Sequence, residues 1–461
     1  MRFISFIIFS FIFSFGLRGQ FELSPVQEID HVKDIIPVGE LNDELYTIIK
    51  HKKQVKLQVH STDQLILKRE LELDLRKGGH FRDLETAFIF DSNFVYVTSY
   101  ANLTTEKRIV ELFQVVGDSV LPAVEIAELS MKNLPVGPWR EYALMIDCLV
   151  SPDGKSLALM YQNQNDMSSV NNRMLVVLNA EIKPVYAIAT TVNFPANQSK
   201  IRFNVKDQLN LLDGGILVQK TLLGVVVYTA EDQYEILLPQ MSANYCVRSL
   251  GPGRLVLCGL YNYSSKGFMV VAYGEKYSRV IRQEFELTDA SGFQVMDLLV
   301  KENREVTLVM EEVVRKQAGR TGVRLNSSQP GSHSPPVSKS TGVEFGDIRL
   351  INFSPNGNKT WEYTILKEEI VSEFSEFSST VFSEGKLIYV LYNGTARLSD
   401  DEKSKKQQHQ PMVCVVQEDG SAVSTPIFSS EHPALLVPAK CNHLKNGCFL
   451  LTTDFFCYFG K

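Results

Sequence analysis

The sequence predicts an all-β protein, a β-propeller of eight four-stranded blades, with seven blades as the alternative. Three observations favour this fold. Short runs rich in Val, Ile, Leu, Phe and Tyr alternate with Gly, Asn, Asp and Ser along almost the whole chain of 461 residues, as in strands joined by turns. No stretch convincingly repeats its apolar residues with the helical period of about 3.6 residues. The runs group into successive four-strand units, which is the pattern of a repeat architecture.

The clearest unit is the segment 145–162, which reads MIDCLVSPDGKSLALMYQ. An apolar run at 145–150 meets a Ser-Pro-Asp-Gly turn, and a second apolar run at 157–161 leaves it. Two apolar runs that flank such a turn predict a β-hairpin. Variants of this hairpin recur through the chain.

The four strands of each unit are named A to D in chain order. The expected B strands follow a turn, at residues 44–49, 94–100, 156–161, 215–219, 254–261, 305–311, 386–392 and 448–452. Most are followed by an apolar C strand, at residues 55–59, 109–115, 174–178, 225–228, 268–273, 348–353 and 412–416. Units of roughly 55 residues suit propeller blades with loop insertions, whereas a β-sandwich stops after about seven to nine strands.

The two ends of the chain predict how the ring closes. The last unit supplies strands at 449–459 but no fourth strand, while residues 21–30 (FELSPVQEID) form a spare strand before the first unit. An N-terminal strand that completes the last blade satisfies both ends and shortens the open sheet edges. We therefore expect one propeller domain over residues 20–461.

One turn carries a resemblance. SPDGKSLAL at 151–159 resembles the turn and strand of the WD40-like propeller repeats of exported bacterial proteins and propeller-bearing peptidases. The turn at 354–358, followed by Thr360 and Trp361, resembles the C–D turn of propeller blades and, loosely, the sialidase Asp-box. That box has Asp where Asn356 stands and Gly where Asn358 stands, so the resemblance implies a turn that shapes a blade and no active site.

The N-terminus predicts export. One arginine precedes a mostly apolar run at 3–16, and small Gly19 follows it, as in a signal peptide spanning 1–19. The run is shorter than the roughly 20 residues of a membrane-spanning helix, so we expect no transmembrane segment after cleavage. The expected location is the periplasm, the cell surface or the medium. A net charge of −6 argues against nucleic acid as a partner.

The seven cysteines are an odd number, so at least one thiol is free or pairs with another chain. Cys246 and Cys258 lie symmetrically about a Gly-Pro-Gly turn, which places them opposite each other in a hairpin and within disulfide reach. Cys441 and Cys448 are the second candidate pair. Buried free thiols are the alternative for each pair. Without a second Cys/His pair at ligand spacing, no metal site is expected.

Long connections predict which end of the ring binds a partner. The B–C and D–A connections of a blade lie at one end of the ring, here called the B–C/D–A rim. It receives a Ser/Pro-rich insertion at 315–345, expected to be disordered, and a polar insertion at 397–410. One D–A connection contains Lys77 and His80, and a second contains Trp139 and Arg140. Loops on a rigid scaffold commonly carry recognition, so these four residues are the candidate partner-binding residues. Packing of Trp139 between blades is the structural alternative.

The sequence favours a binding or scaffold module over an enzyme. It contains no Gly-x-Ser-x-Gly elbow, no Gly-rich phosphate loop and no calcium loop, so neither a catalytic residue nor a cofactor is assigned. The function expected is recognition of a protein or glycan by the B–C/D–A rim. The alternative is a carbohydrate-active enzyme whose acidic residues converge at the central channel, which two or three carboxylates about 5–10 Å apart would favour.

Overall fold

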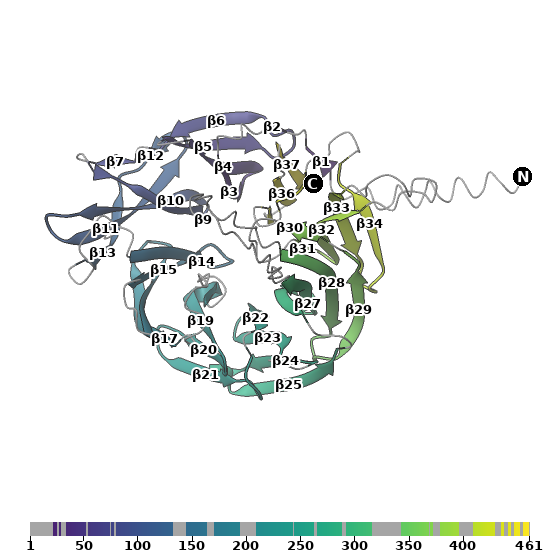
Figure 1. Ribbon diagram of the computed structural model, residues 1–461. Helices are drawn as coiled ribbons and strands as arrows, with labels where there is room; N and C mark the ends of the chain where they lie inside the picture. The colour runs from purple at the N-terminus through teal and green to yellow at the C-terminus, as the bar shows by residue number, and fades with distance from the viewer. Residues whose placement is uncertain are drawn as a thin grey trace, which may run out of the picture.

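The computed structural model is a ring of antiparallel sheets around a central axis (Figure 1). It describes residues 22–460 with interruptions, of which the longest are 132–143, 164–169, 194–208, 316–342, 372–378, 396–408 and 429–434. The expected signal peptide at 1–19 and most of both loop insertions lie outside the described residues. Both insertions end earlier than expected, because Val343–Phe345 and His409–Gln410 already belong to the strands that follow them.

Seven blades each consist of strands that follow one another in the sequence. Blade 1 consists of β3 (Asp34–Leu41), β4 (Glu44–His51), β5 (Gln54–Ser61) and β6 (Leu67–Glu72). Blade 2 consists of β9 (Asp83–Phe90), β10 (Asn93–Asn102), β11 (Lys107–Val116) and β13 (Val124–Ser130), with short β12 (Ser119–Val120). Blade 3 consists of β14 (Leu144–Val150), β15 (Ser156–Asn163), β16 (Val170–Asn179) and β17 (Pro184–Asn193). Blades 4 and 5 are β18 (Leu209–Leu212), β19 (Ile216–Thr221), β20 (Gly224–Tyr228) and β21 (Gln233–Leu237), and β22 (Asn244–Ser249), β23 (Arg254–Leu260), β24 (Lys266–Tyr273) and β25 (Arg279–Glu286). Blade 6 consists of β26 (Phe293–Val300), β27 (Val306–Arg315), β28 (Val343–Phe353) and β29 (Lys359–Ile365), with short β30 (Glu369–Val371). Blade 7 consists of β31 (Ser379–Glu384), β32 (Leu387–Thr395), β33 (His409–Val416) and β34 (Ala422–Pro426). Two 3-10 turns, η4 (Asp213–Gly215) and η5 (Glu275–Tyr277), lie in blades 4 and 5.

The expected count of eight four-stranded blades is corrected to seven. The described segment after β34 supplies only β35 (Asn442–His443), β36 (Gly447–Leu451) and β37 (Phe455–Gly460), so it cannot form a blade from consecutive strands. These strands instead form an antiparallel sheet with β1 (Glu22–Leu23) and β2 (Gln27–Glu28), which both pair with β37. We call it the mixed sheet because it combines strands from both ends of the chain. Ser24, between β1 and β2, also receives a hydrogen bond from the Tyr458 amide on its Oγ, at 2.9 Å.

The hairpin of β14 and β15 lies where the sequence predicts it, with Val150 opposite Leu157. Its turn is held by Ser151, whose Oγ donates to Asp153 Oδ1 and accepts from the Ser156 amide. Gly154 has φ +68°, a conformation that costs glycine little. The turn also reaches both neighbouring blades.

Two hydrogen bonds make these links. The Asp153 amide donates to Asp213 Oδ1 of blade 4 at 2.9 Å, and the Asp91 amide of blade 2 donates to the Gly154 carbonyl at 2.8 Å. Burial raises the pKa of the Asp153 carboxyl, but hydrogen bonds from Ser151 and the Lys155 amide outweigh it, so the pKa lies below its ordinary value. The turn that the sequence singles out therefore fixes three blades to one another.

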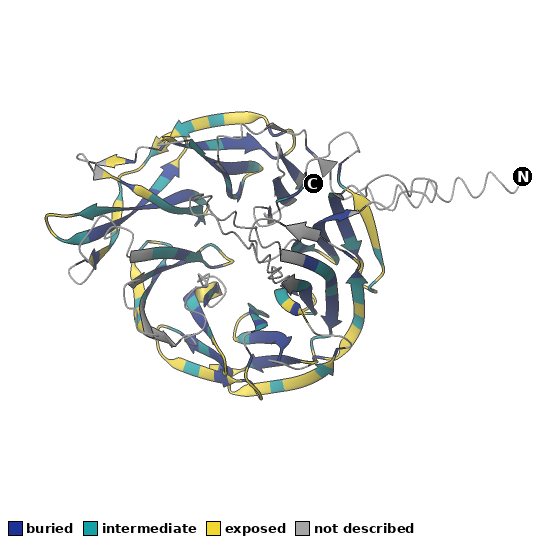
Figure 2. Ribbon diagram, in the orientation of Figure 1, coloured by how far each residue is buried: buried dark blue, intermediate teal, exposed yellow. Residues whose placement is uncertain are grey.

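The hydrophobic core lies between the blades and not within any one of them. Alternate residues of a middle strand face opposite neighbours: Leu217 packs with blade 3 and Val218 with blade 5, and both are fully buried. This is the period of two that apolar runs in strands produce when both faces of the sheet are covered. Figure 2 shows the consequence, with buried middle strands and exposed residues along the outer strands β6, β25 and β34.

A buried histidine joins blade 1 to the mixed sheet. His60 is 4% exposed, its Nδ1 lies 3.3 Å from the Leu65 carbonyl, and its ring meets Phe456 edge to face at 5.8 Å. Burial lowers the pKa of His60 below its ordinary value, although the contact with the Leu65 carbonyl raises it.

This histidine makes folding pH-dependent. Because its pKa is lower in the folded chain than in the unfolded chain, its contribution is complete above the unfolded pKa of about 6.5 and is lost as the pH falls through the folded pKa. We expect the free energy of unfolding to fall less steeply between about pH 7.5 and pH 5 in His60→Gln than in the native chain. Urea unfolding at a series of pH values measures this difference, and identical slopes would show that His60 does not contribute.

Candidate functional site

The B–C/D–A rim carries a small hairpin between blades 1 and 2. It consists of β7 (Arg76–Lys77) and β8 (His80–Phe81), with Lys77 opposite His80 and Arg76 opposite Phe81. Two of the four predicted partner-binding residues, Lys77 and His80, are thus paired neighbours. Trp139 and Arg140 lie outside the described residues, so their role stays a prediction.

A buried arginine anchors this β7–β8 hairpin. The Arg82 amide donates to the Leu75 carbonyl at 2.8 Å, and its Nη1 donates to the Arg76 carbonyl at 3.1 Å. Its Nε forms an ion pair with Glu111 at 2.8 Å, and both side chains are at least nine-tenths buried. The guanidinium also lies 4.9 Å from the centre of the Phe113 ring. Arg82, which directly follows β8, therefore ties the start of β7 to Glu111 in blade 2.

A second buried arginine, Arg108, contacts Asp83, two residues after the hairpin. Arg108 donates from Nε to Ser99 Oγ at 2.8 Å, and from Nη2 to Glu85 at 3.0 Å and Asp83 at 3.2 Å. Its side chain is 5% exposed, whereas that of Asp83 is 49% exposed. Buried charges that are fully paired hold a local geometry, because separating them leaves an uncompensated charge.

Exposed apolar side chains gather on the same rim of blade 4. Leu222 and Leu223 form the β19–β20 turn, and their carbonyls accept hydrogen bonds from the amides of Ser242 and Leu238 in the connection to blade 5. The four exposed side chains, Leu222, Leu223, Leu237 and Met241, are 36%, 57%, 54% and 51% exposed. We call this set the leucine patch. Contiguous apolar surface that stays in water marks an interaction site more often than isolated apolar residues do.

Polar side chains connect the innermost strands of three successive blades. Arg248 on β22 forms an ion pair with Asp297 on β26, and its Nη1 lies 3.5 Å from Asn210 Oδ1 on β18. Asn244 adds a bridge, accepting from the Val295 amide at 2.6 Å and donating to the Phe293 carbonyl at 3.2 Å. The Asp297 carboxylate therefore has an arginine as its partner and serves to tie blades together.

All seven cysteines are free thiols in the structure. Cys246 lies directly opposite Cys258 on the neighbouring strand, as the sequence predicts. Cys441 and Cys448 are both buried in the mixed sheet. Burial raises the pKa of Cys441 to about 12 and that of Cys258 and Cys448 well above the ordinary value, so these thiols stay protonated. Disulfide formation at either pair remains a prediction.

Among the described residues, no group of three or more His, Cys, Asp or Glu side chains is arranged to hold a metal ion. No helix in the described part of the chain is long and apolar enough to cross a membrane.

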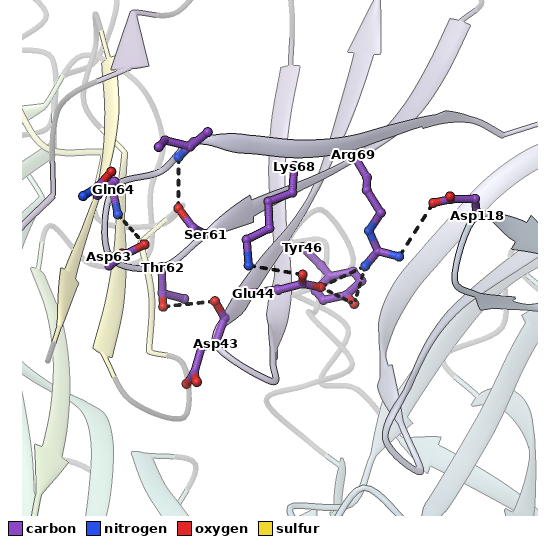
Figure 3. A network of polar contacts seen from close by, with 11 residues as sticks. Asp43, Glu44, Tyr46, Ser61, Thr62, Asp63, Gln64, Lys68, Arg69 and Asp118 are labelled. Atoms are coloured by element: carbon purple, nitrogen blue, oxygen red, sulfur yellow. Dashed lines mark hydrogen bonds and ion pairs between the residues drawn. The ribbon is translucent and has the colours of Figure 1, made fainter.

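A cavity lies between blades 1 and 2 on the opposite rim, which carries the A–B and C–D turns. It has a volume of about 30 Å³ and is lined by Tyr46, Leu57, Val59, Arg69, Leu71, Val115, Gly117 and Asp118. Figure 3 shows the polar groups beside it: Lys68 and Arg69 converge on the carboxylate of Glu44, and Asp118 approaches Arg69 from the neighbouring blade. We call this space the interblade cavity.

Sequence comparison identifies no relative: no family model and no curated protein matches the chain. The resemblance of the Ser-Pro-Asp-Gly turn to WD40-like repeats is therefore not extended to a family. Solved structures do match, at low identity. The β-propeller domain of the trilobed protease from Pyrococcus furiosus is 13% identical over 83% of this chain and 81% of that chain, with a TM-score of 0.32.

Two further structures match over most of this chain. An uncharacterized protein, lmo1340 from Listeria monocytogenes, is 10% identical over 88% of this chain and all of its own, with a TM-score of 0.39. Prolyl oligopeptidase B from Galerina marginata is 8% identical, with a TM-score of 0.40, and the match spans 94% of this chain but 55% of that chain. At these identities and TM-scores, the matches assign neither a family nor a function to this chain.

Proposed function

We propose that this protein is an exported, non-catalytic β-propeller that binds a protein partner through its B–C/D–A rim. The leucine patch is the observation that carries the proposal. Four large apolar side chains stay in water on a backbone fixed by hydrogen bonds, so binding would bury them without first ordering the loops that carry them. An apolar patch favours a protein over a glycan as the partner.

The charges near the patch support a partner with an acidic border. Lys220, two residues before Leu222, lies with its Nζ 5.0 Å from the centre of the Tyr245 ring. Arg282 of blade 5 donates to the Leu237 carbonyl at 3.3 Å. Complementary charge around an apolar centre steers association and fixes orientation. The β7–β8 hairpin, with Arg76 and Lys77, adds positive charge on the same rim.

The test compares two equally exposed residues on opposite rims. Leu223 is 57% exposed in the leucine patch, and Ile66 is 58% exposed in the β5–β6 turn of blade 1. Proteins captured from an envelope extract identify the partner, and titration of the purified partner then gives the affinity. Leu223→Asp is expected to weaken binding at least about tenfold, while Ile66→Asp leaves it unchanged.

Both variants change an exposed side chain, so both should melt close to the native protein, and melting is the control for folding. Equal affinity of Leu223→Asp and the native protein would refute the proposal. Capture that glycosidase treatment abolishes would identify glycan, and not protein, as the ligand.

We also propose that the N-terminal segment closes the ring, with the mixed sheet acting as the joint between the last blade and the first. The core cluster of this sheet supports the proposal, because it includes Leu45 and Ile49 of blade 1 and Tyr389 and Leu391 of blade 7. A closed ring keeps the rim rigid, which the binding function requires.

A further inference from the structure

The interblade cavity is independent of the B–C/D–A rim and lies on the other face of the ring. Its floor is the face of blade 1, where Tyr46, Val59 and Arg69 stand opposite one another on three adjacent strands. Leu57 and Leu71 form the next row, and Val115 of blade 2 covers them. A volume of about 30 Å³ is room for about two water molecules, or for one small aliphatic group.

Two basic and two acidic side chains surround the mouth of the cavity: Lys68 and Arg69, and Glu44 and Asp118. Glu44 pairs with two cations, Lys68 at 3.3 Å and Arg69 at 2.9 Å, so one carboxylate serves two positive side chains. The Tyr46 hydroxyl donates to Glu44 at 3.3 Å and accepts from Arg69 Nη2 at 3.2 Å. Burial raises the pKa of Tyr46, so its hydroxyl is neutral and adds no negative charge. Figure 3 shows these groups on one side of the guanidinium.

The other side of the Arg69 guanidinium is available to a ligand. In the described part of the chain, its Nη1 makes no hydrogen bond, and the nearest acid, Asp118 Oδ1, lies 3.8 Å away. Asp118 is 85% exposed, so this contact is a weak surface pair. Beside it, no atom lies within 4 Å of the position of a Cβ on Gly117, which leaves this part of the mouth open.

We propose that the interblade cavity binds a carboxylate attached to a small aliphatic group, such as the C-terminus of a peptide ending in valine or a free branched-chain acid. The aliphatic group would fill the space between Leu57, Leu71 and Val115. The carboxylate would take the place of Asp118 and accept hydrogen bonds from Arg69, whose planar fork suits a carboxylate. An apolar lining with a few polar groups that orient the ligand is common in small-ligand sites.

The test uses N-acetylvaline and N-acetylvalinamide, in which a neutral carboxamide replaces the carboxylate. Binding is followed by ligand-observed NMR. The native protein is expected to bind the acid and not the amide. Arg69→Gln should weaken binding of the acid at least about tenfold. Asp118→Asn should strengthen it by roughly two- to fivefold, because it removes the competing carboxylate. Lys68→Gln, which also loses a pair with Glu44 but does not line the cavity, is the matched control and should change binding by less than about twofold.

Two further ligands distinguish the sources of the carboxylate. Binding of isobutyrate would identify a free acid as sufficient, whereas binding only of a short peptide ending in valine would identify a chain end. The proposal fails if no acid binds the native protein, if the amide binds as well as the acid, or if Arg69→Gln binds like the native protein. Asp118→Asn changes an exposed side chain, so it gives an answer even if Arg69→Gln does not fold.

Discussion

Lys367→Met is expected to lower the free energy of unfolding by about 3–5 kcal/mol, because it leaves a buried carboxylate without its cation. Lys367 Nζ and Glu311 Oε1 are 2.7 Å apart, and both side chains are fully buried. Glu311 lies on β27 of blade 6, and the Ser379 hydroxyl of blade 7 also donates to it, at 3.1 Å. The pair therefore sits at the joint between two blades. Urea unfolding measures the loss.

The double variant Glu311→Leu/Lys367→Met is the control for this effect. Replacing both charges by apolar groups removes the desolvation cost together with the attraction, so much of the lost stability should return. A single variant that unfolds like the native protein would contradict the buried pair. A double variant that is as unstable as the single one would show that packing, and not the unpaired charge, causes the loss.

Removal of residues 21–29 is expected to lower the free energy of unfolding by about 3 kcal/mol or more. The deletion takes away β1 and β2 and leaves the edge of β37 unpaired. It also removes Ser24, whose amide donates to the Tyr458 carbonyl at 2.8 Å and whose hydroxyl accepts from the Tyr458 amide at 2.9 Å. Each such hydrogen bond contributes about 1 kcal/mol net, and the exposed strand edge favours aggregation.

A chain that begins at residue 20 is the matched control, because it retains both short strands. It should unfold like the full chain, whereas the chain that begins at residue 30 should not. Ser24→Ala isolates the side-chain bond and should cost about 1 kcal/mol. Equal stability of the two shortened chains would contradict closure of the ring by the N-terminal segment.

The fold could be predicted from the sequence because its determinants are local. Alternating apolar runs and turn residues define each hairpin without reference to distant parts of the chain, and the B strands of all seven blades lie where the runs indicate. The count of eight four-stranded blades was wrong, because the described segment after β34 supplies only β35, β36 and β37. The spare strand at 21–30 signals that the N-terminus pairs elsewhere in the chain, but its division into two short strands beside β37 has no local signal.

The candidate sites were harder to predict, because exposure and contacts between blades decide them. Leu222 and Leu223 resemble core residues in the sequence, and only the tight β19–β20 turn places them in water. Arg69 and Glu44 are 25 positions apart in the sequence, on the strands β6 and β4 that flank β5. The basic connection with Lys77 and His80 was recognisable by composition, whereas its anchor, the ion pair of Arg82 with Glu111, was not.

The central claim is that recognition occurs on the B–C/D–A rim. Hydrogen exchange of the partner complex tests this claim most directly. Exchange is measured peptide by peptide for the protein alone and bound to its captured partner. The expected result is slower exchange in the turn of Leu223, the connection of Met241 and the β7–β8 hairpin, with no change in the turns of Ile66 and Asp118. Slower exchange at Ile66 and Asp118, with none at Leu223, would contradict the claim.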